Sequence, residues 1–191
     1  MNIMLLSPFF YPEPISTGKY NTDLVKEIVS KGYNVTVLCS HPIYPDWKVK
    51  ESDKNLVGVN IIRGGLHMRY PKNSILRRAL LELWFASFVL RKVMTMRKQI
   101  DIIISIFPPS LAFSVITKFL PKKIKRIGVV HDLQSIFINQ RKGIIRSFIA
   151  FLIKKVEQYG FNQCSKLILL SYEMKNNLEE LYNFSAKKIE V

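Results

Sequence analysis

An imidazole and a carboxylate stand side by side where an apolar run ends, in the sequence VVHDLQS at 129–135. His131 and Asp132 could take part in catalysis, could bind a phosphate or a metal, or could cap a helix. Asp132 is the only acidic residue between Asp101 and Glu157, in a stretch rich in Lys and Arg. An isolated carboxylate in so basic a region is either a catalytic group or an anchor for the surrounding charge.

A second candidate is a run of small residues, Ser16-Thr17-Gly18, followed by Lys19 at the start of an expected helix. Backbone N–H groups at a helix start can bind an anion, assisted by the helix dipole. Gly18 would allow a close approach of the backbone, and Lys19 would add positive charge. The same residues also fit a plain helix start with Ser16 or Thr17 as N-cap, and the two interpretations are compatible.

A third candidate is the loop SHPIYPDW at 40–47. His41, Tyr44 and Trp47 could line a binding groove, with their rings stacked on a ligand, or they could simply form a packed aromatic loop. Motifs for dinucleotide binding, for a P-loop, for HExxH or GxSxG chemistry and for a DxD metal pair are missing. The three histidines are too scattered to define a metal site, so no metal is expected.

The elements that must position these residues follow from alternating β-rich and helical runs. Strands are expected at 2–7, 34–40, 58–64, 101–107, 126–131 and 166–171, and a further apolar stretch begins at 187–191. Helices are expected at 19–32, about 74–98, 110–120, 144–161 and 172–182. Strands that are apolar on both faces predict a parallel sheet covered on both sides.

The expected fold is therefore α/β: one doubly wound, mostly parallel Rossmann-like sheet of about seven strands with helices on both faces, covering residues 1–191. Ligands of such sheets bind at the carboxyl ends of the strands, which is where every candidate loop lies. Cys39 and Cys164 lie in or beside apolar runs without metal spacing, which indicates buried free thiols and a reducing compartment. The N-terminus reads as a strand and not as a signal peptide.

The charge balance restricts the partners. The 29 Lys and Arg residues exceed the 14 acids, so the net charge is +15, and 48% hydrophobic content supports a core. Such an excess calls for an anionic partner, which could be nucleic acid, an anionic membrane or a phosphorylated substrate. RNA-binding modules expose aromatic residues on a sheet, and these strands look covered on both sides, so no nucleic acid is expected.

The helix expected at 74–98 suggests a membrane contact. One face is core-like and carries Ile75, Ala79, Leu83, Ala86, Leu90 and Val93. The opposite side carries Leu81, Trp84, Phe85 and Phe88, together with Arg77, Arg91 and Lys92. These residues could press into an anionic bilayer, or a second layer of protein could cover the aromatics. The segment RKGIIRSFIAFLIKK at 141–155 is a further membrane candidate.

The run LSPFFYPEPISTGKYNTDLVKEIVSKGYNVTVLCSHPIYPDWKV at 6–49 resembles the opening of family 4 glycosyltransferases of the GT-B fold. Among these it looks closest to the colanic-acid and O-antigen biosynthesis type. The motifs FPPS and HDL, Glu157 and Ser171 then follow in the order of the family. The chain departs from the family at 17–19, where relatives often have Gly-Gly or Gly-Ala, and in its polar, basic loop after HDL.

The resemblance implies the acceptor-side half of a retaining, metal-independent hexosyltransferase without a resident cofactor. It implies a nucleotide-sugar donor, held mainly by a C-terminal domain that this chain lacks, so the chain alone is expected to be inactive. The implied acceptor is a polyprenyl-diphosphate-linked saccharide of O-antigen or exopolysaccharide synthesis. The implied location is cytoplasmic, peripheral on the inner face of the plasma membrane. The alternative is a basic membrane-surface or nucleic-acid-binding module without catalysis.

The candidate residues have expected roles in such a transfer. Asp132 and His131 are the expected catalytic residues. The expected contacts to substrate or phosphate are Ser16, Thr17, Gly18, Lys19, His41, Tyr44, Pro108, Glu157 and Ser171. For the last two, a buried ion-pair member and an N-cap are equally good interpretations.

Overall fold

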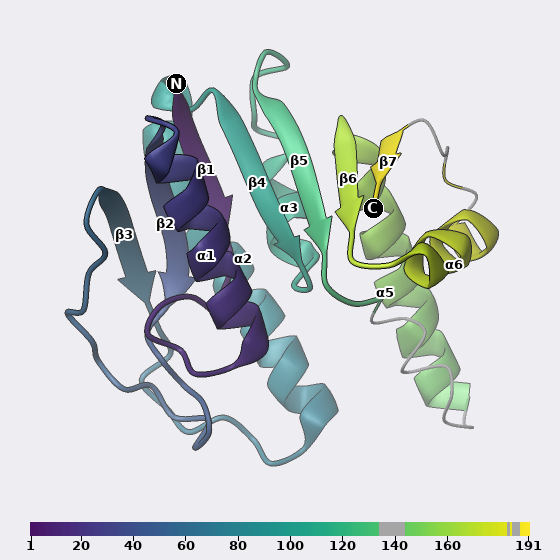
Figure 1. The fold of residues 1–191 in the computed structure, drawn as a ribbon. Coiled ribbons are helices and arrows are strands. Elements are labelled where there is room, and N and C mark those ends of the chain that lie inside the picture. Colours follow the sequence, from purple (N-terminus) through teal and green to yellow (C-terminus); the bar gives the residue numbers. More distant parts are fainter. Residues whose placement is uncertain (134–143, 183, 185–187) are drawn as a thin grey trace.

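The computed structural model describes residues 1–133, 144–182, 184 and 188–191. A single sheet of seven parallel strands forms the centre, in the order β3-β2-β1-β4-β5-β6-β7 (Figure 1). The strands are β1 (Asn2–Leu6), β2 (Asn34–Ser40), β3 (Val59–Gly64), β4 (Ile102–Phe107), β5 (Lys125–Val130), β6 (Lys166–Leu169) and β7 (Ile189–Glu190). The predicted α/β, Rossmann-like fold is confirmed.

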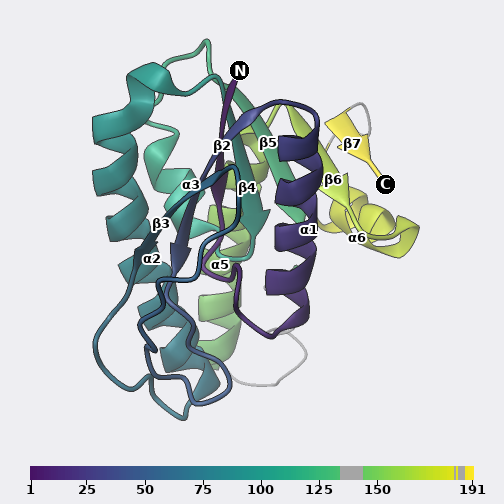
Figure 2. The ribbon, with the colours of Figure 1, turned by 60° about the vertical axis from the view of Figure 1, so that its left-hand side comes forward.

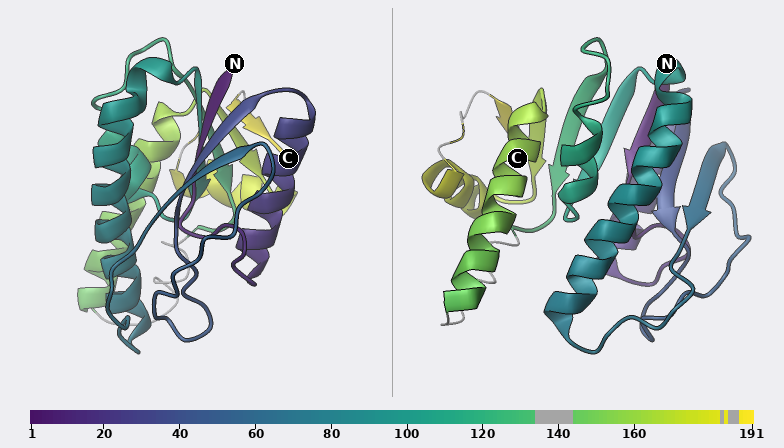
Figure 3. Two further views of the ribbon diagram at one scale, coloured as in Figure 1. Left: turned by 90° about the vertical axis from the view of Figure 1, so that its left-hand side faces the viewer. Right: turned by 180° about the vertical axis from the view of Figure 1, so that it is seen from behind.

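Helices cover both faces of the sheet. They are α1 (Ser16–Ser30), α2 (Ser74–Met96), α3 (Leu111–Ile116), α5 (Ile144–Gln163) and α6 (Tyr172–Tyr182), and a short 3-10 turn, η1 (Arg97–Gln99), follows α2. Figures 1 and 3 show α1 on one face and α2, α3 and α5 on the other. Helix α6 lies beside α5, and its buried Leu178 and Tyr182 belong to the same core cluster as α5. Viewed from the side of β3, the two helical layers enclose the sheet (Figure 2).

The core has a part on each face, because strand side chains alternate between the two. In β1, Met4 and Leu6 belong to the cluster under α2, α3 and α5, whereas Ile3 and Leu5 belong to the cluster under α1. All four side chains are buried. The central strands are therefore apolar on both faces, as a covered parallel sheet requires.

Helix α2 is buried on the side that the sequence analysis assigned to a membrane, and also at Ala86 and Val93 of the predicted core face. Leu81, Phe85 and Phe88 are buried, and Leu83, which was expected in the core, is 61% exposed. The prediction that Leu81, Phe85 and Phe88 contact a membrane is therefore wrong. The reason is that α2 packs against two surfaces at once. Phe85 and Phe88 join the cluster on the sheet, while Leu81 packs with the loops after β2 and β3.

The other residues assigned to this membrane contact lie in mixed surroundings. Trp84 is half-buried and stacks on Phe88, with 5.5 Å between the ring centroids. Arg77 is also half-buried, and its guanidinium lies 4.0 Å from the ring centroid of Trp47. Arg91 and Lys92 are exposed. None of the helices in the described part of the chain is long and apolar enough to cross a membrane.

Both cysteines are free thiols in the core, as predicted. Cys39 lies in β2 with the cluster under α1, and Cys164 follows α5 in the opposite cluster. Burial raises the pKa of each thiol to about 12, so neither carries thiolate at neutral pH. Their role is packing.

Candidate site at the carboxyl edge of the sheet

All seven strands end at the same edge of the sheet, because all their pairings are parallel (Figure 1). The start of α1 lies at this edge. The N-cap residue of α1 is Ile15, which has an extended backbone and makes no capping hydrogen bond with its side chain. Neither Ser16 nor Thr17 is therefore the N-cap. The first turn begins with peptide N–H groups that no capping side chain satisfies, so it remains suited to an anion.

Gly18 is required at this turn by close packing. A Cβ atom at this position would lie 2.9 Å from the backbone oxygen of Glu13 and 3.1 Å from its Cβ. Any side chain here would push the loop after β1 away from the helix. The sequence analysis predicted that Gly18 allows a close approach of the backbone to an anion. In the structure, the group that lies close to Gly18 is the loop after β1.

Glu13 is a buried side chain of this edge that the sequence analysis missed. Its carboxylate accepts hydrogen bonds from the backbone N–H of Ile43 at 3.0 Å and of Tyr44 at 2.6 Å. Burial raises its pKa, although the two N–H donors and Lys50 act in the opposite direction. Glu13 therefore ties the loop after β1 to the loop after β2. The only signal in the sequence was an acid inside a Pro- and aromatic-rich loop.

The loop after β2 is packed and cross-linked by polar contacts. The Nδ1 atom of His41 accepts a hydrogen bond from the backbone N–H of Ser52 at 3.2 Å. Burial, assisted by Arg63, lowers the pKa of His41, so this imidazole is neutral at pH 7. Tyr44 is exposed and meets Trp47 edge-on at 6.2 Å between centroids. The outward-facing ring available for stacking is therefore that of Tyr44.

The loop after β5 delivers His131 and Asp132 to the same edge. The backbone N–H of His131 donates to the oxygen of Phe107, which continues the pairing of β5 with β4. The imidazole ring lies 6.3 Å from the ring of Tyr20 in α1, centroid to centroid. The structure thus brings His131 beside the first turns of α1, as the sequence analysis expected for strand ends of one sheet.

Asp132 is half-buried and has one hydrogen bond in the described structure, from the backbone N–H of Leu133 at 2.9 Å. Burial raises its pKa, and the Leu133 N–H and Arg78 oppose this rise. Burial likewise lowers the pKa of His131, which favours the neutral imidazole. A carboxylate with a raised pKa next to a neutral imidazole suits proton transfer. The bond to Leu133 also braces the loop after β5.

The remaining predicted residues have structural roles. Glu157 is 1% exposed, and its carboxylate accepts a 2.5 Å hydrogen bond from the Tyr182 hydroxyl. Its predicted contact with substrate is therefore wrong, because the group lies in the core. The Ser171 hydroxyl accepts from the Met174 N–H and caps α6. Pro108 follows β4 at the carboxyl edge and is half-buried.

The sequence profile of the family described as Glycosyltransferase Family 4 matches residues 17–191. The chain belongs to this family. Among solved structures, it is similar to WaaG, a glycosyltransferase involved in lipopolysaccharide biosynthesis, with TM-score 0.65 and 10% identity. That match covers 98% of this chain and 44% of the WaaG chain. The chain therefore spans less than half the length of that relative.

The chain is also similar to sucrose-phosphate synthase from Thermosynechococcus elongatus, with TM-score 0.57 and 13% identity. That match covers 93% of this chain and 81% of the other. No curated protein matches the sequence. Likenesses at this identity show the fold, which is that of GT-B N-terminal domains. Family and fold together support a role in glycosyl transfer.

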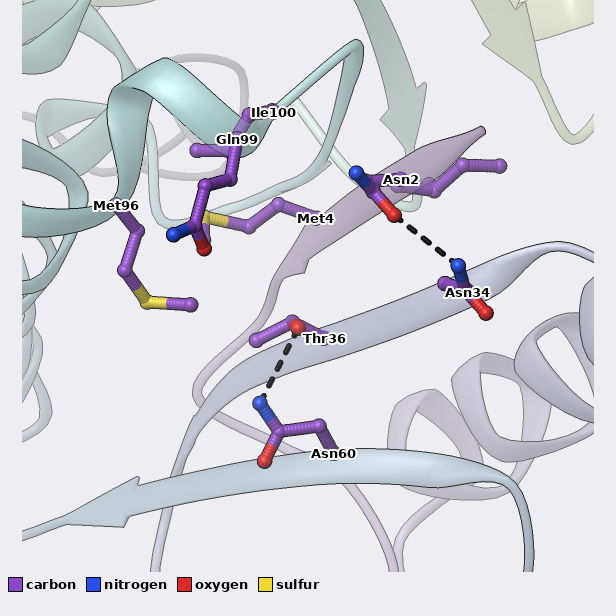
Figure 4. A pocket seen from close by; sticks show the side chains of 9 residues that line it. Asn2, Met4, Asn34, Thr36, Asn60, Met96, Gln99 and Ile100 are labelled. Atoms are coloured by element: carbon purple, nitrogen blue, oxygen red, sulfur yellow. Dashed lines mark hydrogen bonds between the residues drawn. The ribbon is translucent and has the colours of Figure 1, made fainter.

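The carboxyl edge of this glycosyltransferase domain is distinct from a pocket at the opposite, amino-terminal edge (Figure 4). That pocket has a volume of about 240 Å³ and lies between the starts of β1, β2 and β3 and the end of α2. Asn34 donates to Asn2, and Asn60 donates to Thr36, along its wall. The amides of Asn2 and Asn34 thus bond to each other, and that of Asn60 bonds to the Thr36 hydroxyl. None of the predicted site residues lines this pocket.

A metal site has no support in the described part of this domain. Groups of three or more His, Cys, Asp or Glu side chains that could hold a metal ion are absent from the described residues. The polar groups at the edge include the start of α1, Lys19, His131 and Asp132. They can attract an anion and exchange a proton.

Proposed function

We propose that this chain is the acceptor-binding domain of a retaining, metal-independent glycosyltransferase. The enzyme moves a sugar from a nucleotide-sugar to a polyprenyl-diphosphate-linked saccharide in the synthesis of a surface polysaccharide. A C-terminal domain outside this chain holds most of the donor, so the chain alone does not turn over. This proposal is consistent with the family and with the share of the WaaG chain that is matched.

One observation carries the proposal: the contact of His131 with Tyr20, which brings the loop after β5 against α1. The uncapped helix start and the acid–imidazole pair thereby share one edge. Glycosyl transfer requires both functions, because phosphate charge must be stabilised and an acceptor hydroxyl must be positioned and deprotonated.

The residues divide this work. The first turn of α1 and Lys19 attract a phosphate group, through peptide N–H donors, the helix dipole and a positive charge. Asp132 orients the acceptor hydroxyl and takes its proton, and neutral His131 hydrogen-bonds the sugar. Tyr44, exposed on the neighbouring loop, offers a ring face to a sugar.

The proposed acceptor also fits the charge of the chain. A polyprenyl diphosphate is anionic and membrane-bound, and the chain carries a net charge of +15. An excess of this size attracts both the diphosphate and an anionic leaflet. We therefore place the protein on the cytoplasmic face of the plasma membrane, without a spanning segment of its own among the described helices.

A binding experiment tests the acceptor role on the 191-residue chain. The chain is titrated calorimetrically with a water-soluble, short-chain prenyl diphosphate monosaccharide, and Lys19→Gln is compared with Lys26→Gln. Both lysines are exposed on α1, but only Lys19 lies in its first turn. We expect saturable binding that Lys19→Gln weakens and Lys26→Gln leaves unchanged. Absence of binding, or equal weakening by both variants, contradicts the proposal.

A further inference from the structure

Helix α5 presents large apolar side chains to solvent along one line. Phe148, Phe151, Leu152 and Tyr159 are 61%, 53%, 48% and 38% exposed. Their spacing of three, four and seven residues places them on one side of the helix. We call these four residues the α5 stripe. The opposite side of α5 packs in the core through Ala150, Glu157 and Phe161.

Two lysines contact the rings of the α5 stripe in the described part of the chain. The ammonium of Lys155 lies 5.5 Å from the ring centroid of Phe151, and that of Lys118 lies 5.9 Å from the ring centroid of Tyr159. The single acid of α5, Glu157, is buried and bonded to Tyr182. An apolar line flanked by lysines, with no acid exposed on its helix, resembles the face of a helix that lies in a lipid interface.

We propose that the α5 stripe docks this chain on an anionic lipid bilayer. This inference rests on the proposed function, in which the acceptor is lipid-linked. From Phe148 to Tyr159 the helix extends roughly 16 Å, enough to lie along a surface and too short to span one. Phe and Leu side chains enter the acyl boundary, and Lys118 and Lys155 reach the anionic headgroups.

The direction of α5 fits this docking. The helix begins near the carboxyl edge of the sheet and runs back alongside it, antiparallel to the strands (Figures 1 and 3). Phe148 and Phe151 lie in the half of α5 nearer to that edge. A bilayer against this half lies close to the candidate site, so that a lipid-linked saccharide reaches the site without leaving the membrane.

A second copy of the chain is a poorer occupant of the α5 stripe. A symmetric contact through the stripe would bring Lys118 and Lys155 of both copies together. Like charges in an interface oppose association. A lipid surface, in contrast, supplies negative headgroups and apolar depth at the same place. Self-association is therefore an outcome that counts against the proposal.

The test uses co-sedimentation of the chain with phosphatidylcholine vesicles, with and without phosphatidylglycerol. We expect binding to the anionic vesicles, weakened at least about tenfold by the double variant Phe148→Ser/Phe151→Ser. The control Tyr172→Ser removes a ring that is 73% exposed from α6, outside the α5 stripe, and leaves binding unchanged. Circular dichroism of each variant checks folding. The double variant Lys118→Gln/Lys155→Gln provides an independent arm, with a loss of roughly fivefold for each lysine.

Several results overturn the proposal. One is a wild-type chain that does not bind anionic vesicles. Another is a folded Phe148→Ser/Phe151→Ser variant that binds these vesicles as strongly as the wild type. A wild-type dimer in solution that this variant abolishes assigns the α5 stripe to self-association instead. Titration with the water-soluble acceptor needs no lipid. If the chain binds the soluble acceptor but not the vesicles, only the docking proposal is refuted. If it binds the vesicles but not the soluble acceptor, only the acceptor role is refuted.

Discussion

The carboxylate of Glu13 holds the backbone N–H of Tyr44 at 2.6 Å, although the two residues belong to loops that follow different strands. A second bond, to the N–H of Ile43, makes the contact bidentate. These loops carry the start of α1 and the exposed Tyr44 ring. Their relative position at the candidate site therefore depends on one buried acid.

Removal of this acid should destabilise the fold. Glu13→Ala leaves two backbone N–H groups, one of them fully buried, without their acceptor, which costs about 1–3 kcal/mol. Glu27→Ala, at an exposed Glu of α1, should cost less than about 0.5 kcal/mol. Urea unfolding of the three proteins measures both values. Equal midpoints for the two variants would contradict the role of Glu13 as a tie.

The raised pKa of Glu13 predicts a pH dependence. Because burial raises the pKa in the folded state, the protonated form is favoured there, and the contribution of Glu13 to stability falls as pH rises through the folded pKa. Glu13→Gln does not titrate. The difference in unfolding free energy, wild type minus Glu13→Gln, should therefore decrease as pH rises from the usual pKa of 4.5 towards neutrality. A difference that increases with pH would show that the N–H bonds outweigh burial.

The start of α1 should tolerate one substitution and resist another. Gly18→Ala places a Cβ 2.9 Å from the backbone oxygen of Glu13, and this overpacking should cost about 1–3 kcal/mol. Ser16→Ala should cost little, because Ile15 and not Ser16 is the N-cap. Thermal unfolding compares the two variants. A loss of stability in Ser16→Ala as large as that in Gly18→Ala would contradict the assigned cap.

Under the proposed function, Asp132 should be essential for transfer in an enzyme that contains both the acceptor-side and the donor-side domain. We expect Asp132→Asn to lower kcat by about 10²–10⁴-fold with folding intact, since the amide cannot take a proton. In the wild type, activity should rise with pH through the raised pKa of Asp132, and that limb should vanish in Asp132→Asn. Asp23→Asn, an exposed acid of α1, is the control. Undiminished turnover of Asp132→Asn would reduce Asp132 to a loop brace.

The corrected orientation of α2 predicts opposite results for two apolar residues of this helix. Phe88→Ser removes a buried ring and should cost about 3–5 kcal/mol. Leu83→Ser, at an exposed position, should change stability by less than about 0.5 kcal/mol. Chemical denaturation distinguishes the two. A Phe88→Ser variant as stable as the wild type would indicate that the aromatic side of α2 lies on the outer surface and not in the core.

The sheet was predictable because its signals are local. Each strand is a short apolar run that ends in Gly, Pro or polar residues, and all the expected strands are present near their expected bounds. Parallel pairing then placed the loops after β1, β2 and β5 at one edge without further information. His131 and Asp132 reached that edge for the same reason.

The face of α2 and the role of Glu13 were not predictable, because both depend on distant partners. Helix α2 is apolar on both sides, and the outcome was decided by contacts such as Phe88 against Gly64, where a Cβ would lie 2.8 Å from the ring. Glu13 accepts hydrogen bonds from backbone N–H groups about thirty positions away. Because the donors are backbone groups, the residue types at those positions do not indicate the contact. Periodicity shows that a helix has an apolar side, but it does not rank two such sides.

The place of β1 in the middle of the sheet has a consequence for biosynthesis. On one side β1 pairs with β2, and on the other with β4, where the N–H of Asn2 bonds to Asp101, 99 positions along the chain. While the ribosome is still making the intervening segment, one edge of an apolar strand has no neighbour. Nascent chains of this protein should therefore depend on chaperones until β4 emerges.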